Sequence, residues 1–147
     1  MSLLTGMEAS ASGLTAQRFR LDVIANNIAN VSTTRTSEGG PYRRRFVLFM
    51  PREAPTGPLV PGSWQGPLGA PGRGVRVVAV GQDRAPLRRV YDPGHPDADA
   101  EGYVDYPNVY VAREMVDMIS ATRAYEANAT AVSSAKDMAQ RALQIGA

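Results

Sequence analysis

All eleven prolines of the 147-residue chain lie between Pro41 and Pro107, and eleven of its fourteen glycines lie between Gly39 and Gly102. Proline lacks a backbone donor and glycine loses much conformational entropy on ordering, so both residues interrupt helices. The two ends of the chain can therefore form long helices, whereas the middle cannot. We expect an N-terminal helix in 1–32, a β-rich domain in 33–107 and a C-terminal helix in 108–147.

The middle segment contains four short stretches rich in β-branched and aromatic residues. They predict strands at 42–50, 74–80, 87–92 and 102–106. A small antiparallel sheet or a β-ribbon is the simplest assembly of these pieces. The stretch 51–73 is so rich in proline and glycine that we expect an irregular loop there.

Each end of the chain carries an apolar stripe at steps of three and four residues, the spacing of one helix face. The N-terminal stripe is Leu4, Met7, Ala11, Leu14, Leu21, Ala25 and Ile28. The C-terminal stripe is Val111, Met115, Met118, Thr122, Tyr125, Ala129, Val132, Ala139 and Leu143. Helices of about 28 and 36 residues would be about 42 and 54 Å long, too long to bury both stripes in a compact globule.

We therefore predict an α+β fold in which the two terminal helices pair as an antiparallel coiled coil beside a small β-rich middle domain with its Pro/Gly-rich loop. The residues expected to pair the helices within the chain are Leu14, Leu21, Ile28, Met118, Tyr125 and Val132.

Each predicted helix also has a second row, away from its stripe. On the N-terminal helix this row begins with Ser12 and Thr15, and on the C-terminal helix its first half is made of small residues. Helices occupied on two faces need additional neighbours, so we infer packing against other chains. The alternative is ordinary surface composition, because scattered exposed apolar residues are common. The expected subunit contacts are Phe19, Val23, Asn26, Asn27 and Asn30 on the N-terminal helix and Ser120, Ala124, Ala127, Ala131 and Met138 on the C-terminal helix.

Three asparagines in the stretch LDVIANNIANVSTT are unusual in a helix, because the asparagine amide competes for backbone groups. Asn26 and Asn30 continue the row of Phe19 and Val23, while Asn27 points to another sector beside the stripe. We interpret the asparagines as hydrogen-bonding groups that make a contact between subunits specific. Asn30 is also expected to help end the helix. Asn108, after Pro107, is the expected N-cap of the C-terminal helix.

The sequence offers little for catalysis or ligand binding. It has no cysteine and a single histidine, His95, so we expect no thiolate nucleophile, no metal site and no cofactor. The net charge is only +2, and Arg43, Arg44 and Arg45 would alternate between the faces of a strand, so we expect no nucleic-acid binding. We therefore predict that the protein is not an enzyme and has no small-molecule substrate.

The N-terminus lacks a charged region followed by a continuous apolar one, and no apolar run approaches the roughly 18 residues of a membrane span. We expect a soluble chain that, if exported, uses no cleaved signal peptide.

Two stretches resemble a known family. LDVIANNIANVSTT resembles the signature shared by bacterial flagellar rod and hook proteins. The stretch GYVDYPNVYVAREMVDMISATRAYEAN, followed by AKDMAQRALQIG, resembles the C-terminal signature of proximal rod members of that family. Ser32 and Tyr110 depart from the usual asparagines of the pattern. The positions that carry the C-terminal resemblance are Pro107, Asn108, Glu114, Met115, Arg123, Tyr125, Glu126 and Asn128.

The resemblance implies a structural subunit of the flagellar basal-body rod, a part of the drive shaft. Such subunits are exported by the flagellar type III apparatus without a cleaved signal and assemble in the periplasm. Their terminal helices form an inner coiled-coil layer around the export channel. The implied partners are further copies of the chain, other rod proteins, and the rod-base adaptor in the membrane-ring region.

Unpaired amphipathic ends have too little partner surface in a free monomer. We therefore expect 1–32 and 108–147 to be largely mobile until assembly orders them. The alternative function is a protein-binding module, in which a helical hairpin with a β side domain grips one partner and does not polymerise.

Overall fold

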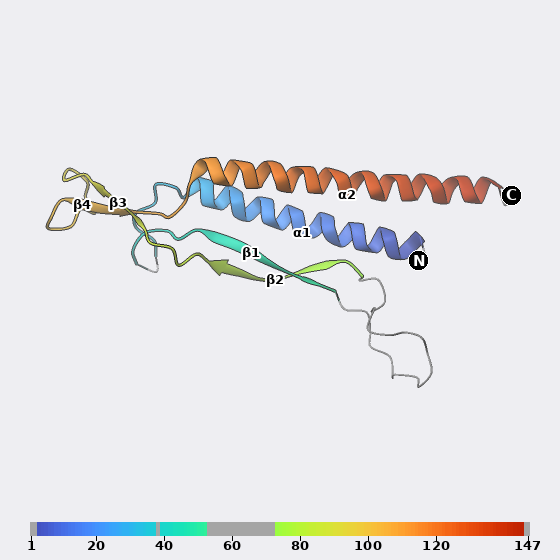
Figure 1. Cartoon of the computed structure of the whole chain (residues 1–147), viewed down its shortest axis with the longest axis horizontal. Coiled ribbons are helices and arrows are strands. Elements are labelled where there is room, and N and C mark those ends of the chain that lie inside the picture. The colour runs from blue at the N-terminus through green and yellow to red at the C-terminus, as the bar shows by residue number, and fades with distance from the viewer. Residues whose placement is uncertain (1–2, 38, 53–72, 146–147) are drawn as a thin grey trace, which may run out of the picture. The chain divides into compact units, whose positions relative to one another are not determined.

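The computed structural model describes residues 3–37, 39–52 and 73–145. In these ranges the chain forms two α-helices and four β-strands, in the order α1, β1, β2, β3, β4, α2 (Figure 1). The fold is therefore α+β, as predicted. Most of the irregular loop expected at 51–73 lies outside the described residues.

Helix α1 spans Leu3–Ala29, close to the segment predicted for it. The expectation that Asn30 helps to end this helix is confirmed. The Asn30 side chain donates to the carbonyl oxygen of Asn26 at 2.9 Å and accepts from the Thr33 hydroxyl at 3.1 Å. The Asn26 carbonyl also accepts from the Asn30 backbone amide at 3.1 Å, so Asn30 binds the last turn twice and links it to Thr33 beyond the helix.

Helix α2 spans Val111–Ile145, a stretch without proline or glycine. The prediction that Asn108 caps this helix is wrong, because the helix begins at Val111 and its first turn is closed by the Glu114 amide donating to the Tyr110 carbonyl at 3.0 Å. The Asn108 side chain instead binds the backbone of the middle segment.

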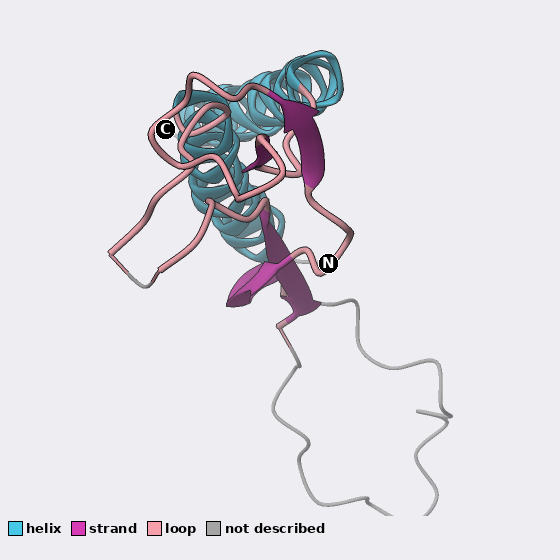
Figure 2. Ribbon diagram, turned by 90° about the vertical axis from the view of Figure 1, so that its left-hand side faces the viewer, coloured by secondary structure: helices cyan, strands magenta, loops and turns pink. Residues whose placement is uncertain are grey.

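All four predicted strands are present. They are β1 (Arg45–Pro51), β2 (Val75–Gln82), β3 (Arg88–Tyr91) and β4 (Tyr103–Tyr106). In the described residues they form two separate two-stranded sheets, β1 with β2 and β3 with β4 (magenta in Figure 2), and not one sheet. Strands β3 and β4 are antiparallel, with Val90 opposite the buried Val104.

The contacts divide the chain into two compact units. The first unit is Met1–Arg18, Phe49–Val78 and Arg123–Ala147, and the second unit is Phe19–Leu48 and Ala79–Thr122. Each unit combines part of both helices with part of the β-containing middle. The division by composition into 1–32, 33–107 and 108–147 concerns segments of sequence and stays a prediction.

Two glycines mark close approaches in the first unit. A β-carbon on Gly13 of α1 would lie 2.9 Å from the side-chain oxygen of Asn128 on α2, and one on Gly74 would clash with Oγ of Ser12. The Val75 amide donates to the same Ser12 hydroxyl at 2.9 Å. Ser12, which the sequence placed in a row facing other chains, thus contacts the start of β2 in its own chain.

The buried positions of α2 recur every seven residues. Glu114, Ala121 and Ala135 are buried, and the half-buried Asn128 lies in the same series. The apolar stripe predicted for this helix is wrong at Met115 and Thr122, which are exposed, whereas Met118, Ala129, Val132 and Ala139 are half-buried. The stripe was chosen for apolarity, whereas small and polar side chains occupy the side where another element approaches closely.

The six residues predicted to pair the helices are partly covered. Leu14, Leu21, Ile28, Met118 and Val132 are half-buried, and Tyr125 is 37% exposed. Their pairing stays a prediction.

The largest fully buried side chains of the described residues are Glu114, Val104, Asn27 and Pro107, all in the second unit. Two of these four are polar, which is unusual because buried charges and amides lose hydration. The second unit is therefore organised around polar groups. No helix in the described ranges is long and apolar enough to span a bilayer.

Candidate functional site

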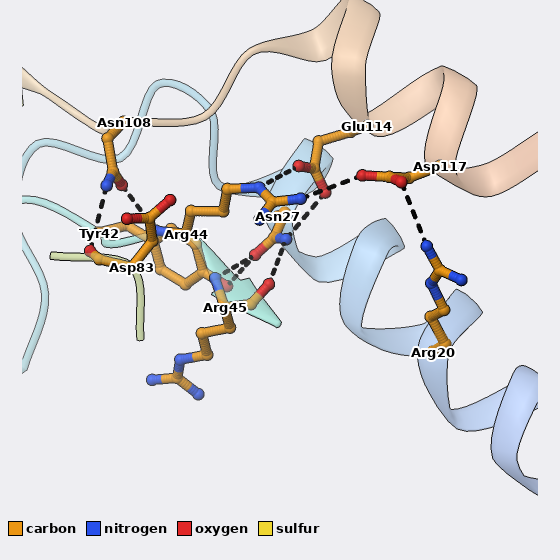
Figure 3. Close-up of polar contacts among 9 residues, drawn as sticks. All are labelled: Arg20, Asn27, Tyr42, Arg44, Arg45, Asp83, Asn108, Glu114 and Asp117. Carbon is orange, nitrogen blue, oxygen red and sulfur yellow. Dashed lines mark hydrogen bonds and ion pairs between the residues drawn. The ribbon is translucent and has the colours of Figure 1, made fainter. Parts of the chain in front are cut away.

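A buried polar cluster joins α1, β1 and α2 in the second unit (Figure 3). Its members come from the second half of α1, from the start of β1 and the segment that leads into it, from just after the end of β2, and from the start of α2 with the residues just before it. They are Arg20, Asn27, Tyr42, Arg44, Arg45, Asp83, Asn108, Glu114 and Asp117.

Asn27 is the centre of the cluster and is 0% exposed. Its Nδ2 donates to the Arg45 carbonyl at 2.8 Å and to Oε2 of Glu114 at 2.9 Å. Its Oδ1 accepts from the Arg45 amide at 2.9 Å and from the Tyr42 hydroxyl at 3.0 Å. The amide thus uses both hydrogens and both lone pairs, and it binds Arg45 as a neighbouring strand would.

Glu114 is the buried charge of the cluster, also 0% exposed. Its Oε1 accepts from Nε of Arg44 at 2.5 Å, and the same guanidinium donates to Asp117 at 3.1 Å. Asp117 in turn accepts from Arg20 of α1 at 3.2 Å. Glu114 and Asp117 are three residues apart and share a helix face, so one arginine can bridge them. The result is a chain of alternating charges that compensates the burial of Glu114.

Asn108 holds the other side of the cluster and is 4% exposed. Its Oδ1 accepts from the Arg44 amide at 2.8 Å, and its Nδ2 donates to the carbonyl oxygens of Asp83 and Ala85 at 3.1 and 3.3 Å. Arg44 is therefore held by its backbone through Asn108 and by its side chain through Glu114, which leaves it little freedom to turn.

Tyr42 donates to Asn27 from a buried position, with the Arg45 guanidinium 5.6 Å from its ring centroid. Burial raises the pKa of the Tyr42 hydroxyl above its ordinary value, although the charge of Arg45 lowers it in part. A raised folded-state pKa keeps the hydroxyl protonated as a donor. Its contribution to stability is complete below the ordinary tyrosine pKa and is lost as pH rises through the raised one.

An open groove of about 420 Å³ lies on another side of α1 in the second unit. Most of its lining is apolar. It is lined by Phe19, Asp22, Val23, Asn26, Asn30, Tyr42, Arg45 and Val80. Four of the five contacts predicted on the N-terminal helix thus share one wall, because they lie on one helix face.

The prediction for Asn27 needs correction. Its side chain has no exposed surface and all its hydrogen-bonding groups have partners within the chain. Asn27 is therefore a residue of the buried cluster and not of a subunit surface. The neighbouring Asn26 is exposed, and among the described residues its side-chain amide donates to the carbonyl of Asp22 alone.

The second row of α2 remains accessible. Ser120, Ala127, Ala131 and Met138 are exposed, and Ala124 is half-buried. Of the positions that carry the family resemblance, Pro107, Asn108 and Glu114 are buried, Asn128 is half-buried, and Met115, Arg123, Tyr125 and Glu126 are exposed. The signature therefore contains residues that hold the chain together and residues that remain open to neighbours.

Sequence reasoning missed the cluster itself. Arg20, Tyr42, Arg44 and Asp117 were not singled out as partners, and Glu114 was named only for its resemblance to the family. One signal was present, because Asn27, Arg44 and Glu114 are polar residues inside segments predicted to be regular. Among the described residues, no group of three or more carboxylate or imidazole side chains is placed to hold a metal ion.

Comparisons with known proteins extend over the whole chain. The family described as "Flagella basal body rod protein" matches residues 7–35, and "Flagellar basal body rod FlgEFG protein C-terminal" matches residues 100–145. The flagellar basal-body rod protein FlgC of Borreliella burgdorferi is 50% identical, over 99% of this chain and 98% of the relative. The FlgC proteins of Bacillus subtilis and Escherichia coli are 43% and 40% identical, over 99% of both chains in each case.

The two family matches cover the asparagine motif and the stretch from β4 through α2, so they include the residues of both helices that meet in the buried cluster. The resemblance noted in the sequence is confirmed. The chain belongs to the FlgC family of flagellar basal-body rod proteins.

Proposed function

We propose that the chain is a structural subunit of the proximal part of the flagellar rod and polymerises through its terminal helices around the export channel. The observation that carries this proposal is the similarity to FlgC proteins along the full length. Exposed apolar side chains on both helices support it, because they would be covered in a polymer.

We further propose that α1 and α2 pair as an antiparallel coiled coil. The seven-residue recurrence of buried positions on α2 supports this arrangement. The order of the contacts within the second unit also supports it, because the earlier residue of α1, Arg20, meets the later residue of α2, Asp117, while Asn27 meets Glu114.

The proposed partners are further copies of the chain, the other rod proteins, and the rod-base adaptor in the membrane-ring region. The proposed location is the periplasmic part of the rod, reached through the type III export apparatus. In this role the protein needs no catalytic residue, cofactor or nucleic acid.

Assembly requires a surface on which small side chains allow close approach, and we assign this role to Ala124 and Ala127 of α2. Ala124→Glu or Ala127→Glu places a charge there and should reduce incorporation into basal bodies by at least about tenfold. Ser133→Glu is the matched control, because Ser133 is also small and exposed on α2 but lies on another side of the helix.

Incorporation is measured by immunoblotting of basal bodies purified from cells that express each variant in place of the native protein. Normal incorporation of both alanine variants would show that this row is not an interface. A stable one-to-one complex with a single partner, in place of incorporation, would favour the binding-module alternative.

We also propose that the parts of both helices farthest from the buried cluster, 5–17 of α1 and 125–143 of α2, become fully ordered only on assembly. The buried cluster holds the nearby helix turns together in the monomer. Amides of 20–29 and 111–121 should therefore exchange hydrogen more slowly there than those of 5–17 and 125–143. Hydrogen-exchange mass spectrometry measures this directly, and uniform protection along both helices would contradict the proposal.

A further inference from the structure

The second unit carries an apolar surface on α2 that nothing in the described part of the chain covers. Val111, Met115, Val116 and Ile119 of α2 are 41%, 54%, 67% and 55% exposed. Their spacing places them on one side of the helix, and we call them the α2 patch. Burying such side chains fully removes a large apolar area from water, so the patch is an effective docking surface.

The groove beside α1 is the concave counterpart in the same unit. Its apolar lining includes Phe19, Val23 and Val80, and Phe19 and Val80 are themselves exposed. Asp22 and Arg45 also line it. Among the described residues neither forms an ion pair, so the groove presents one negative and one positive group to an incoming partner.

The α2 patch is followed along the helix by charges of both signs. Arg123 and Glu126 lie four and seven residues after Ile119, on the same side of α2, and both are exposed. Neither forms an ion pair within the described ranges. An occupant of the groove that carries this helix face would offer Arg123 to Asp22 and Glu126 to Arg45, which matches the charges as well as the apolar surfaces.

From these surfaces we infer that the α2 patch of one copy docks into the groove of a second copy. This inference rests on the proposed function, and it names the surfaces through which copies meet. The patch and the groove are different surfaces of the same unit, so the contact is head-to-tail. Such a contact leaves a free patch at one end and a free groove at the other, so further copies can add until the rotation between copies closes a ring.

The direct test is photocrosslinking in the assembled structure. Benzoylphenylalanine replaces Ile119 in a chain expressed in place of the native protein, and basal bodies are purified after irradiation. The inference predicts a dimer-sized product in which position 119 is joined to peptides within 19–30 or 42–48. A product with another segment, a product with a different rod protein, or an incorporated chain that gives no product would each overturn it.

Charge reversal tests the same contact without a bulky probe. Asp22→Arg and Arg123→Asp should each lower incorporation about tenfold, and the double variant should recover to within about threefold of wild type. Both residues lie at the helix surface, so circular dichroism should show unchanged helix content. Two single variants that incorporate normally, or a double variant as defective as the singles, would contradict the inference.

The two proposals fail in distinguishable ways. If the wild-type chain is absent from purified basal bodies, the rod function fails and the docking inference fails with it. If the wild-type chain is incorporated but position 119 is crosslinked elsewhere, only the docking inference fails. As a control, benzoylphenylalanine at the exposed Ala131, which lies on another side of α2 from Ile119, should give no product with 19–30 or 42–48.

Discussion

The two units of the chain bring the same two helices together by different means. In the first unit, Gly13 of α1 lies against the Asn128 side chain of α2, and the contact depends on the absence of a β-carbon. In the second unit, Asn27 of α1 binds Glu114 of α2 within a cluster of hydrogen bonds and ion pairs. Small residues allow helices to approach closely, but directional bonds also determine which residues must meet.

This difference implies different responses to mutation. A buried cluster in which every group has a partner is damaged severely when one member is removed, because the remaining groups lose their partners. A close contact at a glycine is damaged only to the extent that the opposing side chain cannot move. The second unit should therefore be the more sensitive of the two.

The largest effect is expected for Glu114→Ala. The substitution removes the acceptor of Nε of Arg44 and of one hydrogen of the Asn27 amide in a buried site, and the free energy of unfolding should fall by about 3–5 kcal/mol. Urea denaturation of the purified chain, followed by circular dichroism, measures this change. Glu126→Ala removes an exposed carboxylate from the same helix and should change it by less than about 0.5 kcal/mol. Equal effects of the two variants would refute the structural role of the cluster.

A somewhat smaller loss, about 2–3 kcal/mol, is expected for Asn27→Ala, because the Arg45 backbone and Tyr42 lose a buried partner. Asn27→Asp should be at least as damaging, since its second oxygen would face Oε2 of Glu114 at the place of a 2.9 Å hydrogen bond. The matched control is Asn26→Ala, one residue earlier and exposed. The same denaturation experiment applies, and an Asn26 variant that is less stable than the Asn27 variants would contradict the burial of Asn27.

The glycine contact of the first unit should respond more weakly. Gly13→Ala gains about 1 kcal/mol of helix propensity but forces the Asn128 side chain to move, for a net loss of about 1 kcal/mol. Gly6 lies in the same helix, and a β-carbon added there would meet no atom of the described residues within 4 Å, so Gly6→Ala should gain the full amount. Thermal unfolding compares the two. Adding Asn128→Ala to Gly13→Ala should relieve the clash, and a double variant without relief would show that Asn128 does not cause it.

The smallest effect on stability is expected for Asp99, in the turn between β3 and β4 in the second unit. Hydrogen bonding from the Tyr103 amide, assisted by Arg89, holds the pKa of Asp99 below its ordinary value. The contribution of this carboxylate to stability is present above the ordinary aspartate pKa and is lost as pH falls through the lowered one. A carbon-13 NMR titration should show the lowered pKa. Arg89→Met should raise it only in part, because the Tyr103 amide is the larger cause, and a complete return to the ordinary value would contradict that order.

Much of the fold can be predicted from the sequence because its determinants are local. Proline and glycine confine the helices to the ends, and β-branched stretches mark the strands. The 100° spacing of helical residues also places Phe19, Val23, Asn26 and Asn30 on one face, and these residues line one groove. The buried row of α2 could not be predicted from the apolar pattern. An apolar pattern favours Met115 and Thr122, whereas the buried positions are Glu114 and Ala121.

The kinds of element, their order and the resemblance to rod proteins follow from local features of the sequence. Which polar residues lie inside depends on how distant segments pack in the fold. Asn26 and Asn27 are the same residue type at adjacent positions, yet one is exposed and the other is fully buried. The difference depends on Arg45, 18 residues away, and on Glu114, 87 residues away. An amide is stable inside a protein only where such distant partners satisfy it, and a local pattern contains no record of them.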